Sequence, residues 1–245
     1  MNADFRWFLL DKVKVNEETN DTFSKLLTFY KQQLLNVKGK ILEVGVNQLL
    51  LLPALKESGL QIEGIVPNNK KVESHSAKVY HAELANFKLP SFYDVIIIPF
   101  GYILTIQERV EAIKTLKCCY EHLKPNGRIM IDLILQDEFH LNQRKVKTKN
   151  GQGQLIICES QVIEVDFYAQ IVKYLLSYEQ WNEGELILSE RKLQSFLWFG
   201  VKEFKLVLER IGFMDVKLYG DYQESKSNAG MSDMKMFTFE ASKTV

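Results

Sequence analysis

Cysteine and histidine are scarce in this sequence, which has three cysteines and four histidines among 245 residues. Cys118 and Cys119 are adjacent within a helical pattern, and Cys158 lies far away in a predicted strand, so their spacing offers no disulfide framework. No CxxC or HxxxH spacing indicates a structural metal site either. We therefore expect a fold that rests on its hydrophobic core, without cross-links or a structural metal.

An excess of charge of one sign is also absent, because 31 basic and 31 acidic residues give a formal net charge of zero. Such a chain has no global field to draw it toward nucleic acid or an anionic membrane, so a nucleic-acid role would need a local basic patch. No apolar run is long enough to span a bilayer or to form the core of a signal peptide. We expect a cytoplasmic protein with no membrane partner.

The composition that remains is that of a globular protein, with 46% hydrophobic, 25% charged and 11% aromatic residues. Apolar residues recur at helical spacing over residues 21–37, where Asn20 or Asp21 is the expected N-cap. The length fits one large domain with a sizeable insertion. We expect a single domain over 1–245, with a helical lead-in over 1–37, a core over 38–141 and 200–245, and an insert over 142–199.

Strands and helices alternate five times through the first part of the expected core. Pro53 lies in the first turns of one predicted helix, where proline is tolerated best. This alternation predicts an α/β fold in which a mostly parallel sheet carries helices on both faces. The predicted strands are 40–46, 61–66, 79–84, 93–100 and 128–135, and the predicted helices between them include 48–58 and 108–123.

The pattern changes beyond the fifth strand, where residues 155–166, 169–181 and 185–197 predict antiparallel strands. A final helix over 201–211 stops at Gly212, a typical C-terminal glycine, before strands over 214–220 and 234–242. Ahead of the antiparallel strands lies a basic stretch that suits a substrate phosphate, a solvated hairpin or a flexible lid. Its basic residues are Arg144, Lys145, Lys147 and Lys149.

The order of these elements and several local phrases resemble the class I S-adenosylmethionine-dependent methyltransferases, roughly over residues 38–242. "GKILEVGV" resembles their first strand and glycine loop, "FYDVIIIPFGYIL" their fourth strand, and "YEHLKPNGRIMIDL" the helix, turn and fifth strand that follow. "VKEFKLVLERIGFMDVKLYGDY" resembles their closing helix and strand. The antiparallel insert is placed as in small-molecule methyltransferases related to sugar and glycine N-methyltransferases. The resemblance implies a Rossmann-like fold with a seven-stranded sheet, and S-adenosylmethionine as cofactor.

The resemblance assigns the first cofactor contacts to the loop after strand one, which runs acid-x-Gly-x-Gly-x-Gly in the family. Glu43 and Gly45 match this pattern, whereas Asn47 and Leu49 replace the second and third glycines. Asparagine enters left-handed backbone more readily than most residues, so Asn47 is the milder change. Leu49 places a branched side chain where close packing favours none. The alternative is an ordinary strand, turn and buried helix that hold no ligand.

Further cofactor contacts fall at the ends of the next three strands. The acid that takes the ribose hydroxyls in the family falls on Val66, an apolar residue that cannot imitate a carboxylate. Glu83, with the Leu84 amide beside it, matches the acid that takes the adenine amino group. Phe100 and Gly101 follow strand four and face the presumed site. They make no Asn-Pro-Pro-aromatic signature, which disfavours base or glutamine amines as substrates.

Methyl transfer is a nucleophilic displacement on a sulfonium, and alignment with exclusion of water can supply much of its acceleration. A fixed catalytic motif is therefore not required. If a base takes part, Asp137 and His140, just beyond strand five, are the first candidates. The ordinary alternative for either is a solvated loop residue.

The sequence thus predicts an S-adenosylmethionine-dependent methyltransferase for a small-molecule acceptor, with the insert over 142–199 covering the acceptor site or forming a homodimer face. Leu49 and Val66 motivate a second hypothesis, a catalytically inactive methyltransferase-fold protein that acts as a binding or scaffold module. A nucleic-acid-modifying enzyme is disfavoured by the zero net charge and rests on the basic stretch over 144–149 alone.

Overall fold

The computed structural model describes residues 17–45, 51–69, 77–136, 141–142, 144–151, 154–223, 234 and 236–244. These residues form two compact units. One unit comprises the described parts of Lys14–Leu135 and Phe199–Val245 and contains a seven-stranded sheet. The other includes the described parts of Gln136–Trp198 and contains a four-stranded sheet.

The seven-stranded sheet has the order β10-β11-β5-β4-β1-β2-β3. Strands β1 to β5 run parallel to one another, β11 is antiparallel to β5, and β10 is antiparallel to β11. This confirms the predicted α/β fold with a mostly parallel seven-stranded sheet. The strands are β1 (Ile41–Val44), β2 (Ile62–Pro67), β3 (Val79–Ala82), β4 (Tyr93–Ile98), β5 (Leu123–Ile134), β10 (Met214–Gly220) and β11 (Met236–Ser242).

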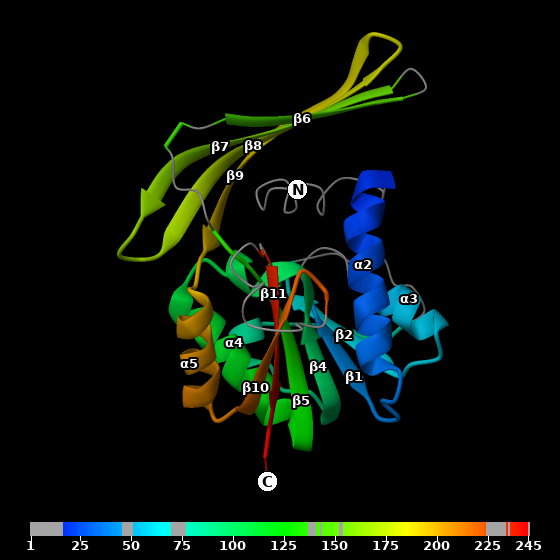
Figure 1. Ribbon diagram of the computed structural model, residues 1–245, viewed down its shortest axis with the longest axis vertical. Coiled ribbons are helices and arrows are strands. Elements are labelled where there is room, and N and C mark those ends of the chain that lie inside the picture. The colour runs from blue at the N-terminus through cyan, green and yellow to red at the C-terminus, as the bar shows by residue number, and fades with distance from the viewer. Residues whose placement is uncertain are drawn as a thin grey trace. The chain divides into compact units, whose positions relative to one another are not determined.

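Helices cover both faces of this sheet, because the central strands are apolar on both sides. Four consecutive residues of β4, from Val95 to Ile98, are buried, and so is every residue of β1. Figure 1 shows α2 and α3 on one face and α4 and α5 on the other. The helices are α2 (Glu17–Leu34), α3 (Leu52–Glu57), α4 (Arg109–His122) and α5 (Val201–Ile211).

Several predicted boundaries were wrong by a few residues. Helix α2 begins at Glu17, so neither Asn20 nor Asp21 is its N-cap. Strand β5 already begins at Leu123. Strand β4 ends at Ile98, because the residues after it leave the extended conformation.

The four-stranded sheet is antiparallel, with the order β6-β7-β8-β9. Its strands are β6 (Arg144–Gly151), β7 (Gln154–Asp166), β8 (Ile171–Asn182) and β9 (Glu185–Leu197). A two-residue turn joins β8 to β9, and Glu183 and Gly184 both have positive φ there, as tight hairpin turns require. Seven of the buried side chains of this sheet form a hydrophobic cluster, namely Cys158, Val162, Val172, Tyr174, Leu176, Tyr178 and Phe196.

The basic stretch over 144–149 is part of strand β6, which pairs with β7 along its whole length. This pairing makes the basic stretch one arm of a hairpin. The described part of the insert has four strands, one more than predicted. The side chains of Arg144, Lys145, Lys147 and Lys149 lie outside the described residues.

Candidate functional site

The carboxyl ends of β1 and β4 mark the place where the strand order of the large sheet reverses. From β1 the chain continues to β2 and β3 on one side, whereas β4 and β5 lie on the other. Open parallel sheets bind ligands outside such a switch point. The candidate site is therefore built from the residues that end the parallel strands.

At the end of β1, Glu43 is only 1% exposed. Its Oε1 accepts a hydrogen bond of 3.1 Å from the backbone N–H of Leu51, immediately before helix α3. The N–H of Gly45 donates to the carbonyl of Ile65 at 3.1 Å. A buried carboxylate thus ties strand β1 to the start of α3 across the glycine loop. Asn47 and Leu49, which lie within that loop, are outside the described residues.

At the end of β4, the chain turns through a 3-10 segment, η2 (Pro99–Thr105). Phe100 and Gly101 both adopt left-handed backbone, with φ of 57° and 68°, and both are buried. For Phe100 this conformation costs about 1–2 kcal/mol, because its Cβ crowds the following carbonyl. Left-handed backbone at a non-glycine residue persists only where its surroundings hold it in place.

Asp132 on β5, which was not among the predicted site residues, holds this turn. Its side chain is completely buried and accepts four hydrogen bonds. Oδ2 accepts from the Phe100 amide at 2.6 Å and from the Tyr222 hydroxyl at 2.9 Å. Oδ1 accepts from the Tyr30 hydroxyl at 2.9 Å and from the Thr238 hydroxyl at 2.7 Å. An ionised carboxylate has about four acceptor positions, and all of them are used here.

Burial raises the pKa of Asp132 above its ordinary value, although its four hydrogen bonds, led by that of the Phe100 amide, act in the opposite direction. Within the described part of the chain, no basic side chain forms an ion pair with it. The signal that could have revealed it is an acid inside the apolar strand "RIMIDLIL", because aspartate is rarely fully buried without a specific role.

Glu43 and Asp132 lie on the same face of the sheet. Glu43 of β1 and Met130 of β5 both pair with Ile97 of β4. Asp132 follows Met130 by two residues, and side chains two residues apart point to the same side of a strand. The buried Tyr30 of α2 is influenced by both acids: burial raises its pKa well above the usual value, and the charges of Asp132 and Glu43 raise it further. The site edge therefore contains two buried carboxylates around one tyrosine.

The ends of β2 and β3 carry the remaining predicted positions. Val66 is completely buried, so the place of the ribose-binding acid is part of the core. Glu83 is exposed and precedes a short 3-10 segment, η1 (Leu84–Asn86), without capping it through its side chain. Leu84 is buried. The candidate bases Asp137 and His140 lie outside the described residues.

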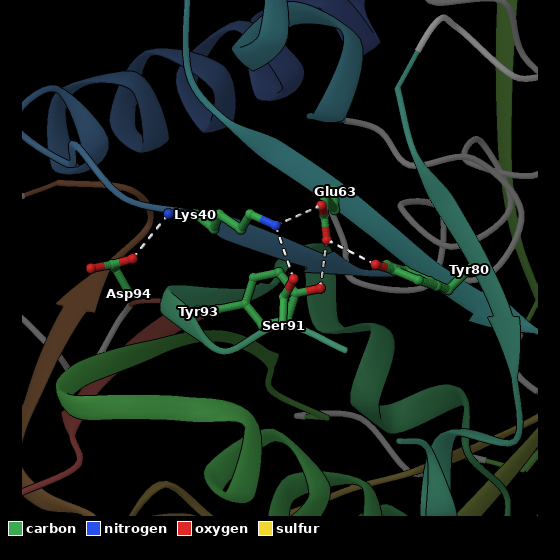
Figure 2. Close-up of polar contacts among 6 residues, drawn as sticks. All are labelled: Lys40, Glu63, Tyr80, Ser91, Tyr93 and Asp94. Atoms are coloured by element: carbon green, nitrogen blue, oxygen red, sulfur yellow. Dashed lines mark hydrogen bonds and ion pairs between the residues drawn. The ribbon is translucent and has the colours of Figure 1, made fainter. Parts of the chain in front are cut away.

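A second polar cluster lies at the opposite, amino edge of the sheet, as Figure 2 shows. Glu63, the second residue of β2, accepts hydrogen bonds from Tyr93 at 2.7 Å, Tyr80 at 3.2 Å and Lys40 Nζ at 3.3 Å. Lys40 Nζ also donates to the Ser91 hydroxyl at 2.9 Å. Because Lys40 precedes β1 and Tyr93 begins β4, these contacts tie together the starts of neighbouring strands. We assign the cluster a structural role.

Among the described residues, no helix is both long enough and apolar enough to cross a membrane. The same residues include no group of three or more histidine, cysteine, aspartate or glutamate side chains placed to hold a metal ion. All three cysteines are buried free thiols.

No protein-family model matches this sequence, and no curated protein matches it. Solved structures do. The CcbJ methyltransferase from Streptomyces caelestis superposes with a TM-score of 0.72 at 14% identity, over 91% of this chain and 90% of its own.

Two further structures give similar agreement. S-adenosylmethionine-bound CalS10, an amino pentose methyltransferase from Micromonospora echinaspora, has a TM-score of 0.67 at 11% identity, over 95% of this chain and 98% of its own. An S-adenosylmethionine-dependent methyltransferase from Clostridium acetobutylicum has a TM-score of 0.68 at 11% identity, over 91% of this chain and 92% of its own. The chain therefore has the class I methyltransferase fold, as the sequence resemblance implied.

Proposed function

We propose that this protein is an S-adenosylmethionine-dependent methyltransferase that acts on a small-molecule acceptor. The observation that carries the proposal is Glu43, a buried carboxylate next to Gly45 at the carboxyl end of β1. It stands at the switch point of a fold that this chain shares, over most of its length, with enzymes that use this cofactor.

The residues at this edge fit the chemistry of the proposed cofactor. S-adenosylmethionine carries a positive ammonium and a positive sulfonium, and charge-assisted hydrogen bonds to carboxylates are the strongest contacts available to such groups. Glu43 is the residue we assign to the ammonium. Glu83, exposed after β3, and the Leu84 amide are assigned to the adenine ring. The Phe100–Gly101 turn is assigned to the wall of the site.

When bound, the cofactor supplies a methyl group on an electron-poor sulfur. The residues of this chain then have to hold it, orient the acceptor and exclude water, which can provide much of the acceleration. The turn at Phe100 and Gly101 suits this task, because the hydrogen bond from the Phe100 amide to Asp132 fixes its backbone. Asp137 and His140 remain the predicted bases for acceptors that must lose a proton.

The acceptors of the fold neighbours guide the choice of the first compounds to test. CalS10 is described as an amino pentose methyltransferase, so small amine-bearing sugars are the first acceptors to screen. The insert over 142–199 remains predicted to cover the acceptor or to form a homodimer face. Sedimentation equilibrium of the full chain tests the second role, since a dimer face requires twice the mass of one chain.

A second candidate function is a binding or scaffold protein that has kept the fold but lost the cofactor. Val66 favours it, because a completely buried valine offers nothing to the ribose hydroxyls. Under this alternative Glu43 serves only to tie β1 to α3.

Calorimetric titration with S-adenosylmethionine separates the two candidates. We expect micromolar binding, about 8 kcal/mol, for the wild-type protein. Glu43→Gln keeps an acceptor for the Leu51 amide but removes the charge, so it should weaken binding at least tenfold. Glu63→Gln is the matched control at the opposite edge, and it should leave the affinity unchanged. No heat at millimolar ligand would overturn the proposal in favour of the scaffold.

A further inference from the structure

Asp132 is a completely buried carboxyl group that accepts four hydrogen bonds, the number that suits an ionised carboxylate, and it lacks a cationic partner among the described residues. Its four hydrogen-bond donors are three hydroxyls and one backbone amide, all neutral groups. Buried charges in proteins are usually paired with an opposite charge, since hydrogen bonds alone do not fully replace lost hydration. The interior therefore keeps an uncompensated negative charge at this place.

The position of this charge relates it to the candidate site. Ile131 pairs with Ile98, the last residue of β4, so Asp132 lies one residue beyond the carboxyl end of that strand. It binds the amide of Phe100 in the turn that follows β4. It also shares a sheet face with Glu43. The negative potential of Asp132 consequently reaches the edge where ligands of this fold bind.

We propose that Asp132 is a positioning residue whose charge makes the site prefer a positively charged ligand, the sulfonium form of the methyl donor, over its neutral thioether product. This inference rests on the proposed function. S-adenosylmethionine and S-adenosylhomocysteine share the amino acid and the adenosine, and they differ by one methyl group and one positive charge. A fixed negative charge acts on that difference alone.

The effect is large enough to measure without direct contact. At an effective dielectric constant of about 20, a charge about 10 Å away still changes a dissociation constant about tenfold. The hydrogen bonds of Asp132 fix its position, so its field does not relax away when the ligand binds. Preference for the charged form favours exchange of product for fresh donor after each turnover.

Asp132→Asn tests the proposal by removing the charge at nearly constant volume. Thr238→Val and Tyr30→Phe are matched controls, because each removes one hydrogen bond to Oδ1 and leaves the charge in place. Calorimetric titration of each variant with the two ligands gives the ratio of their dissociation constants. We expect Asp132→Asn to lower the preference for the sulfonium form about tenfold, and the controls to lose stability while keeping the wild-type ratio.

An equal loss of affinity for both ligands in Asp132→Asn would overturn the proposal, because a purely structural role weakens both alike. If that variant does not fold, the wild-type protein still decides: a preference for the sulfonium form supports the proposal, and equal affinities contradict it. Binding of neither ligand by the wild-type protein instead overturns the proposed function itself.

Discussion

The backbone N–H of Phe100 donates a 2.6 Å hydrogen bond to Oδ2 of Asp132, so a buried carboxylate on β5 fixes the turn that ends β4. The same carboxylate binds hydroxyls from α2, from β11 and from the residues just after β10. Elements distant in sequence thereby converge on one side chain at the carboxyl edge of the sheet. Asp132 thereby links the stability of this edge to the turn at the candidate site.

Removal of the Tyr222 hydroxyl should show how much the hydrogen bonds of Asp132 contribute to the free energy of unfolding. In Tyr222→Phe, Asp132 loses a 2.9 Å hydrogen bond in a fully buried setting, which should cost about 2 kcal/mol of unfolding free energy. Tyr219→Phe is the control, because its hydroxyl lies 3.4 Å from Glu240 and is only half-buried. Urea unfolding of both variants measures the difference. Equal losses would contradict a special role for the Asp132 network.

The left-handed turn should tolerate no side chain at Gly101. With φ of 68°, an alanine there is strained by about 1 kcal/mol, and the β-branched valine by more. We expect Gly101→Ala and then Gly101→Val to lose stability in that order, and to weaken S-adenosylmethionine binding in the same order. Thermal unfolding with and without ligand gives both series. A fully stable Gly101→Val variant would show that the turn does not have this conformation.

The polar cluster around Glu63, at the amino edge of the sheet, predicts a loss of stability at low pH. Burial alone raises the pKa of Glu63, but the hydrogen bonds from Tyr93 and Lys40 bring it below its ordinary value on balance. A lowered folded-state pKa stabilises the protein above the unfolded-state value of about 4.3, and this contribution is lost as the pH falls through the folded-state value.

Glu63→Gln should therefore cost about 1–2 kcal/mol at neutral pH, where the charged hydrogen bonds are intact. The difference from the wild-type protein should be smaller at pH 3 than at neutral pH, because Glu63 becomes neutral as the pH falls through its lowered folded-state pKa. Urea unfolding at the two pH values measures it. A difference that grows as the pH falls would contradict the assignment.

Helix α5 offers a prediction that separates capping from ion pairing. One oxygen of Glu203 contacts Arg109 of α4 at 2.6 Å, and the other accepts from the Gly200 amide at 3.0 Å. Glu203→Ala loses both contacts and should cost about 1 kcal/mol. Glu203→Gln keeps an acceptor for the cap, so its loss should be about half as large. If the two variants unfold at the same denaturant concentration, the cap contributes nothing.

Much of the fold was predictable because apolar patterning is local. Strand β9 and helix α5 have the predicted bounds, and Gly212 ends α5 with a φ of 119° that favours glycine. The parallel arrangement of β1 to β5 was predictable from their apolar runs and the helices between them. The extra strand β6 was harder to predict, because its alternating basic residues suit both a strand and a solvated loop.

The network around Asp132 could not be predicted, because its donors come from positions 30, 100, 222 and 238. No spacing rule joins residues so far apart, and each is unremarkable in its own segment. Glu43 and Gly45 were identifiable only because they form a short local motif beside a strand. Local motifs thus show where the candidate site lies, whereas the tertiary contacts that support it require the structure.

Hydrogen–deuterium exchange of the full chain, with and without S-adenosylmethionine, tests most directly the central claim that a cationic cofactor binds at the carboxyl edge of β1 and β4. We predict that the ligand slows exchange in peptides covering residues 41–45 and 98–104. Peptides covering the amino edge, residues 61–64 and 91–94, should exchange at an unchanged rate. Protection confined to the amino edge, or no protection at millimolar ligand, would contradict the account.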